Sequence, residues 1–92
     1  MTSITKIKST ARKILKKNHV AKAGLFGSFA RNEEREDSDI DILIEFKGGL
    51  LHLIRLQREL EKSLGRRVDL LTYNGIHPPL KKRILKEEVR IL

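Results

Sequence analysis

The chain reads Gly27-Ser28-Phe29-Ala30-Arg31-Asn32-Glu33-Glu34-Arg35-Glu36-Asp37-Ser38-Asp39-Ile40-Asp41 over the stretch that decides its fold. Acidic and apolar residues alternate from Asp39, and this period of two predicts a β-strand from Asp39 to Phe46. The isoleucines then share one face of the strand, and Asp39 and Asp41 share the other. Their Cα atoms would lie roughly 6.6 Å apart at a rise of about 3.3 Å per residue. Both carboxylates can therefore converge on one divalent ion or on a pair of ions.

A second motif precedes this strand. Val20 to Phe26 has the character of a short strand that ends in Gly27-Ser28, and a short helix is expected to begin just after it. Gly27 lets the backbone approach a ligand closely, Ser28 adds a hydroxyl, and a helix start adds partial positive charge, so the turn suits an anion such as a triphosphate. Taken alone, a Gly-Ser turn is usually only a turn, and an Asp-x-Asp is often a solvated strand end. The prediction of a site therefore rests on both motifs flanking one loop.

A third carboxylate follows later in the chain. Leucines recur at helical spacing from Leu51 to Leu64, Gly65 is placed to end that helix, and Val68 to Leu71 has strand character. A right-handed crossover would return this strand beside the Asp39 strand, so that Asp69 joins the acidic pair. A two-metal site requires such a third carboxylate, and hard carboxylate oxygens suit magnesium or manganese.

Two further helices complete the pattern. Apolar residues recur at helical spacing from Thr5 to Asn18, and a last helix is expected from Pro79 to Val89. The apolar stripe of the last helix comprises Leu80, Ile84, Leu85 and Val89. The fold class expected is α/β (α+β), with a small mixed sheet of three or more strands flanked by helices, in a single domain covering residues 1–92.

Composition limits the classes of function. The chain has 92 residues, and 20 Lys and Arg against 12 Asp and Glu give a formal net charge of +8, which attracts nucleotides, nucleic acid or an acidic protein surface. Aromatic residues make up only 4%, so direct nucleic-acid binding stays open but is not favoured. Cysteine is absent and no apolar run is long enough to cross a bilayer, so we expect a cytoplasmic protein that binds no membrane.

The spacing of these motifs carries a resemblance. Gly27-Ser28, ten residues, Asp39-x-Asp41 and then Asp69 on a later strand resemble the signature of the DNA polymerase beta-like nucleotidyltransferase superfamily. The run Gly24-Leu25-Phe26-Gly27-Ser28-Phe29-Ala30-Arg31 is most similar to the minimal nucleotidyltransferase (MNT) domain proteins of prokaryotes. One departure is Asn32, where the family commonly has Gly. Asn tolerates the left-handed backbone better than other non-Gly residues, so the turn is expected to survive.

The resemblance implies an enzyme and its setting. It implies an antitoxin that uses Mg²⁺ or Mn²⁺ to move AMP, or another nucleoside monophosphate, from a nucleoside triphosphate, with ATP as the expected donor. The acceptor would be a hydroxyl, by preference a tyrosine, on a partner HEPN toxin, which is thereby neutralised. Asp39, Asp41 and Asp69 would be the metal-binding and catalytic residues, and Gly27, Ser28 and Arg31 would bind the nucleotide, with support of the loop as the alternative role of Arg31. The alternative is a binding module that neutralises the toxin by docking alone.

Overall fold

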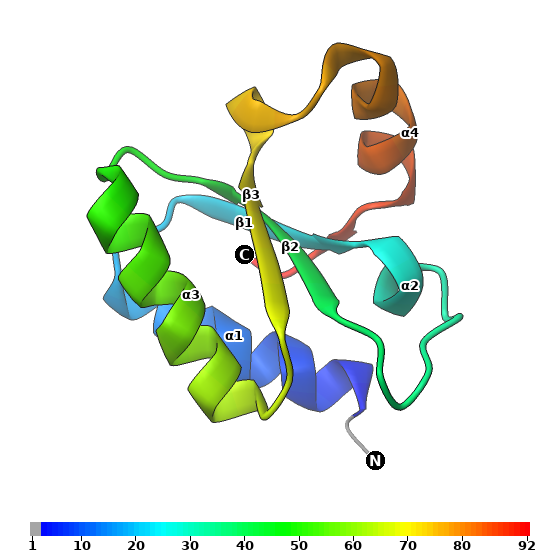
Figure 1. Ribbon diagram of the computed structural model, residues 1–92, viewed down its shortest axis with the longest axis horizontal. Helices are drawn as coiled ribbons and strands as arrows, with labels where there is room; N and C mark the ends of the chain where they lie inside the picture. The colour runs from blue at the N-terminus through cyan, green and yellow to red at the C-terminus, as the bar shows by residue number, and fades with distance from the viewer. Residues whose placement is uncertain (1–2) are drawn as a thin grey trace.

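The computed structural model describes residues 3–92, which form a mixed sheet with helices on both faces (Figure 1). In chain order the elements are α1 (Ile4–Lys17), β1 (Lys22–Phe26), α2 (Gly27–Ala30), β2 (Ile40–Glu45), α3 (Leu50–Leu64), β3 (Val68–Thr72), the 3₁₀ helix η1 (Tyr73–Gly75), α4 (Pro78–Glu87) and β4 (Val89–Arg90). The strand order is β3-β2-β1-β4, with β2 and β3 parallel and the other pairs antiparallel. The expected fold class is confirmed.

The main core lies between the sheet and the pair α1 and α3 (Figure 1). Ser3 begins α1 as its N-cap, since its hydroxyl accepts a hydrogen bond from the N–H of Lys6 at 3.2 Å. The apolar stripes of both helices are buried at the expected spacing: Ile7, Ala11, Ile14 and Leu15 on α1, and Leu56, Leu60 and Leu64 on α3. Two helices therefore seal one face of the sheet and leave the opposite face for the acidic residues.

The expected crossover between β2 and β3 is present. Gly65 ends α3 in the left-handed conformation with φ 67°, and the chain then runs parallel to β2. Ile40 pairs with Val68, and Asp41 pairs with Asp69. Neighbouring residues of a parallel pair point to the same face, so Asp69 lies on the same side of the sheet as Asp41.

The predicted boundary of the last helix was wrong. The helix, α4, ends at Glu87, because the next residue, Glu88, has an extended backbone conformation with ψ 134°. Val89 belongs instead to β4, an edge strand paired with β1, and Ile91 beyond it is 5% exposed in the core. The edge of β1 supplies the physical reason, because Ala23 exchanges backbone hydrogen bonds with Ile91 and Leu92 at 2.9 to 3.1 Å.

The predicted apolar stripe of the last helix is also mostly solvent-facing. Leu80 is 48% exposed and Leu85 is 39% exposed, while Ile84 packs beside a small second cluster of Phe26, Leu43 and Ile76. That cluster covers part of the sheet face opposite α1 and α3. Among the described residues, none of the helices is both long and apolar enough to span a membrane.

The first strand begins two residues later than predicted, at Lys22. Val20 is buried, but its N–H donates to the carbonyl of Leu15 at 3.0 Å and so closes the end of α1. The second strand covers Ile40–Glu45, inside the expected Asp39 to Phe46. These shifts leave the predicted faces of both strands unchanged.

Candidate active site

A row of three residues crosses the sheet at the end of β1. Phe26 pairs with Asp41 on β2, and Asp41 pairs with Asp69 on β3. Neighbouring strands are about 4.8 Å apart, so the Gly27 turn, Asp41 and Asp69 follow one another at that spacing. Ile40 and Ile42 point into the core, whereas Asp41 is half-buried and Asp69 is exposed on the opposite face. The structure thus brings the turn and two of the predicted carboxylates together.

Gly27 and Asp41 are interlocked. Gly27 has φ 72°, a left-handed conformation that L side chains rarely adopt. A Cβ atom at this position would lie 2.0 Å from Oδ2 of Asp41 and 2.9 Å from its Cγ. A residue without a side chain is therefore required both by the turn and by the carboxylate beside it.

The surroundings of Asp41 disfavour its charge. Burial raises the pKa of Asp41 to about 6, and the neighbouring negative charges of Asp69 and Asp39 add to the effect. Arg31 acts in the opposite direction, while Glu87 raises the pKa slightly further. A carboxylate held in the negative field of two others is a group that a cation would stabilise.

The residues present fit a hard divalent cation by their chemistry, although their side chains do not yet converge. Within residues 3–92 there is no group of three His, Asp or Glu side chains already close enough to hold a metal ion. Asp39 faces Arg67, with Oδ1 3.6 Å from Nε, and both side chains are largely exposed. An exposed pair of this length contributes little, so Asp39 can turn toward Asp41 at small cost. The oxygen ligands and their mutual repulsion suit Mg²⁺ or Mn²⁺.

An anion already sits at the Gly27 turn. Oε1 of Glu87 accepts hydrogen bonds from the N–H of Gly27 at 3.3 Å and from Nη1 of Arg31 at 3.2 Å. The helix start expected to attract phosphate is α2, which has only four residues, so its dipole contributes little and the donors are this N–H and this guanidinium. Ser28 is half-buried, and its carbonyl accepts from the N–H of Glu33 at 2.9 Å.

Sequence reasoning missed Glu87, which lies 60 residues from Gly27 in the chain. The loop departure at Asn32 was anticipated correctly, since Asn32 adopts the left-handed conformation with φ 60°. Arg31 also pairs with Glu33, with its Nε 3.2 Å from Oε2. Arg31 therefore lies between two carboxylates, one from the loop and one from α4.

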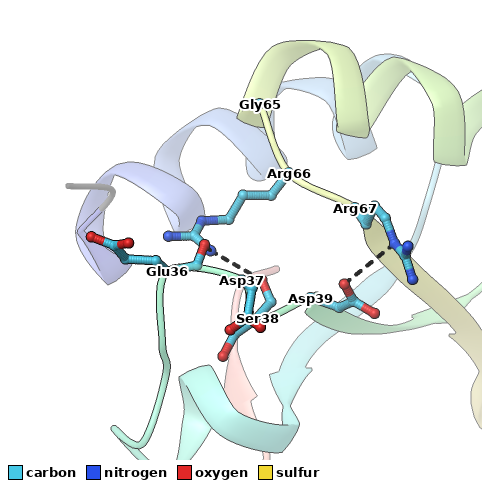
Figure 2. A pocket seen from close by; sticks show the side chains of 7 residues that line it. All are labelled: Glu36, Asp37, Ser38, Asp39, Gly65, Arg66 and Arg67. Atoms are coloured by element: carbon cyan, nitrogen blue, oxygen red, sulfur yellow. Dashed lines mark hydrogen bonds and ion pairs between the residues drawn. The ribbon is translucent and has the colours of Figure 1, made fainter.

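Arg66 holds the loop that carries Asp39 (Figure 2). Its Nη1 donates to the backbone carbonyls of Arg35, Glu36 and Ser38 at 3.3, 2.8 and 3.1 Å. Its guanidinium carbon also lies 5.3 Å from the centre of the Phe29 ring, close enough for a cation–π contact. In the sequence, Arg66 stands out only as one of the 20 Lys and Arg residues that make the chain basic. The structure makes it the residue that ties the acidic loop to the end of α3.

A pocket of about 570 Å³ opens between this loop and the start of β3. Figure 2 shows its walls, with Arg66 reaching across to the loop and Arg67 directed at Asp39. Its lining residues are Glu36, Asp37, Ser38, Asp39, Gly65, Arg66 and Arg67. Asp39 therefore borders the carboxylate row on one side and this pocket on the other.

The fold and the acidic row define a nucleotidyltransferase domain. The family model described as "Nucleotidyltransferase domain" matches residues 8–92, so the chain belongs to the nucleotidyltransferase domain family. A Methanocaldococcus jannaschii protein, provisionally named a protein adenylyltransferase, is 56% identical over 92 residues, which cover 98% of this chain and 99% of the relative. The protein adenylyltransferase MntA of Thermococcus cleftensis is 42% identical over 74 residues, which cover 78% of this chain and 75% of the relative.

Solved structures agree with this assignment. One described provisionally as a minimal nucleotidyltransferase superimposes with a TM-score of 0.77 at 37% identity, covering 89% of this chain and 86% of that one. A toxin–antitoxin structure with AMP-PNP shares the fold, with a TM-score of 0.82 at 21% identity. The superposition covers 92% of this chain and 72% of that one. The resemblance to minimal nucleotidyltransferases inferred from the sequence is confirmed.

Proposed function

We propose that this protein is an antitoxin that transfers AMP from ATP to a tyrosine hydroxyl of a partner HEPN toxin and thereby neutralises it. The observation that carries the proposal is the order of groups across the sheet. The anion-holding Gly27 and Arg31 lie at the end of β1, Asp41 lies on β2, and Asp69 lies on the edge strand β3. A triphosphate and an incoming hydroxyl can thus be held on opposite sides of one carboxylate.

The proposed site residues bind phosphate, hold the metal ion and accept a proton. The N–H of Gly27 and the guanidinium of Arg31 bind phosphate oxygens, with the Ser28 hydroxyl beside them. Asp39, Asp41 and Asp69 would hold Mg²⁺, or Mn²⁺ in its place. Bound there, the ion would neutralise charge on the triphosphate and lower the pKa of a nearby hydroxyl.

The transfer itself is a displacement at the α-phosphorus. The acceptor oxygen forms a bond to that phosphorus, the bond to the bridging oxygen of the β-phosphate breaks, and pyrophosphate leaves with the electron pair. Asp69 accepts the proton of the hydroxyl. Asp69 suits this task because it is exposed on an edge strand, where a group on another protein surface can reach it.

The descriptions of proteins that share this fold support the choice of partner. One structure contains a tri-AMPylated HEPN toxin of Shewanella oneidensis in complex with an MNT antitoxin, and superimposes with a TM-score of 0.70 at 20% identity, covering 94% and 69%. The relative from Thermococcus cleftensis carries the name protein adenylyltransferase. We infer the same class of acceptor for this chain. Attached AMP would add bulk and negative charge beside the ribonuclease site of the toxin and repel RNA.

The test is the intact mass of a HEPN partner after incubation with this protein, ATP and Mg²⁺. Wild type should add one or more AMP units, and Asp41→Ala should add none. Glu45→Ala is the matched control, because Glu45 is an exposed carboxylate at the far end of the same strand. If wild type adds no mass while Asp41→Ala still neutralises the toxin in cells, the protein acts by docking alone.

A further inference from the structure

The carboxylate of Glu87 occupies the groups that we assign to the nucleotide. A single oxygen, Oε1, accepts from both the Gly27 N–H and the Arg31 guanidinium, at 3.3 and 3.2 Å. The Glu87 side chain is only 20% exposed there. A nucleotide phosphate oxygen would use the same two donors, and both anions cannot hold them in the same geometry.

Glu87 comes from an element that is lightly attached at this point. The residues of α4 are all exposed or half-buried, and Figure 1 shows the helix beside α2 rather than over the main core. The next residue, Glu88, is anchored differently. Its carboxylate accepts a hydrogen bond from the Tyr73 hydroxyl. The same carboxylate packs against Gly24, where an added Cβ would lie 2.1 Å from Oε2 of Glu88. The Glu88 side chain is thus anchored at Tyr73, whereas the hydrogen bonds described for the Glu87 side chain are those from Gly27 and Arg31, so it can rotate away from the turn when these donors are taken.

We propose that Glu87 is a built-in competitor for the nucleotide: its carboxylate holds the phosphate-binding donors when no nucleotide is bound, and the triphosphate must displace it. This inference rests on the proposed function, since it assumes that phosphate binds Gly27 and Arg31. The competing arrangement is a supporting one, in which Glu87 stays in place and orients Arg31 toward the phosphate. The two arrangements predict opposite effects when the Glu87 charge is removed.

Competition also selects the form of the nucleotide. Glu87 adds to the negative field of the aspartates, as its effect on Asp41 indicates. A metal-free triphosphate carries more negative charge than its magnesium complex, so this field repels it more strongly. Glu87 therefore makes the affinity for the triphosphate depend more steeply on the divalent cation. Free polyphosphates without a metal ion are thereby kept from the Gly27 and Arg31 donors.

The experiment measures affinity by calorimetry for ATP with Mg²⁺ and for tripolyphosphate in the presence of a chelator. Wild type is compared with Glu87→Gln, which keeps the size of the side chain, and with Glu87→Ala. Glu59→Gln is the charge-matched control, because Glu59 of α3 pairs with Lys17 of α1, away from the Gly27 turn. The amide resonance of Gly27 reports independently on whether Glu87 leaves the turn when the ligand binds.

Both Glu87 variants should bind more tightly than wild type, by on the order of tenfold for metal-free tripolyphosphate and by less for the magnesium complex of ATP. Glu59→Gln should match wild type. Without metal and ligand, the amide resonance of Gly27 in Glu87→Gln should be shifted from its position in wild type. Unchanged or weaker binding in both Glu87 variants, with normal wild-type binding of ATP and Mg²⁺, overturns the competitor, and weaker binding favours the supporting arrangement. Absence of nucleotide binding in every protein would instead remove the proposed function, and this inference with it.

Discussion

Gly27 and Asp41 lie so close that the side chain of one forbids a side chain on the other: a Cβ on Gly27 would be 2.0 Å from Oδ2 of Asp41. The turn that offers its N–H to an anion and the carboxylate proposed to hold a cation are therefore packed as one unit. Phosphate and metal would be neighbours because of this contact, which joins the end of β1 to the start of β2.

A series of three Gly→Ala substitutions separates the causes. Gly49→Ala should cost less than about 1 kcal/mol, since φ is −75°, nothing lies within 4 Å of the added Cβ, and only the preference for glycine over alanine at the N-cap of α3 is lost. Gly65→Ala adds only the left-handed strain, because φ is 67° in open space, and should cost about 1 to 2 kcal/mol. Gly27→Ala adds a collision with Asp41 to the same strain and should cost more than Gly65→Ala. Urea unfolding measures the free energy of unfolding of all three variants. Equal losses of stability for Gly27→Ala and Gly65→Ala would contradict the close contact between Gly27 and Asp41.

The raised pKa of Asp41 predicts a pH-dependent stability in the absence of divalent cations. The folded-state pKa of about 6 lies above the ordinary 3.8, so the folded protein keeps a proton that the unfolded chain releases. Stability is therefore lost as pH rises from about 4 to about 6. A shift of this size corresponds to about 3 kcal/mol at full strength, reduced to about 1 to 2 kcal/mol because Asp41 is half-exposed to screening solvent.

Asp41→Asn tests this directly. The variant should unfold at a higher temperature than wild type at pH 7.5 in chelator, by a margin that disappears near pH 4. Added Mg²⁺ should stabilise wild type and narrow the margin at pH 7.5, because an ion bound only by the folded state favours it. A margin that stayed constant from pH 4 to pH 7.5 would mean that Asp41 is not the titrating group.

Arg66 should govern the order of the acidic loop. Arg66→Lys keeps the charge but loses the planar group that donates to three carbonyls and lies over Phe29. We expect faster amide exchange over residues 35–39 and a loss of about 1 to 2 kcal/mol. Arg67→Lys is the control, because the Arg67 side chain is 84% exposed and makes only a long ion pair, with Nε 3.6 Å from Oδ1 of Asp39. Equal exchange rates in both variants would rule out the proposed role of Arg66.

Asp69→Asn should separate binding from transfer if the proposed function holds. Asp39 and Asp41 still supply two carboxylates to the ion, and the phosphate donors Gly27 and Arg31 are untouched, so affinity for ATP with Mg²⁺ should change by only a few-fold. The rate of AMP transfer should fall by about 10² to 10⁴, the usual contribution of a general base. Parallel calorimetry and time-resolved intact mass measure the two effects. A transfer rate close to wild type would exclude Asp69 as the proton acceptor.

Local patterns determined most of the secondary structure and the position of the acidic row. The alternation from Asp39, the leucine spacing that ends at Gly65 and the single Asp69 within an apolar strand are visible in short windows, because side-chain direction in a strand or helix repeats over a few residues. The return of the Asp69 strand beside the strand of Asp39 and Asp41 then followed from the handedness of a crossover, which is a general rule of chain connection, whereas the register that pairs Asp41 with Asp69 is seen only in the structure. Their chemical roles remain predictions.

Contacts between distant segments were decided by the tertiary structure alone. The final strand β4 forms because β1 has an open edge, which no window around Val89 reveals. Glu87 reaches Gly27 across 60 residues, and Arg66 reaches the acidic loop across 28 to 31. The raised pKa of Asp41 likewise depends on burial and on charges from three separate segments. The sequence by itself determined which residues face which side of β1, β2, β3, α1 and α3, though not of α4. Only folding decided which charges meet, because electrostatic energy depends on distance in space and on the solvent that packing excludes.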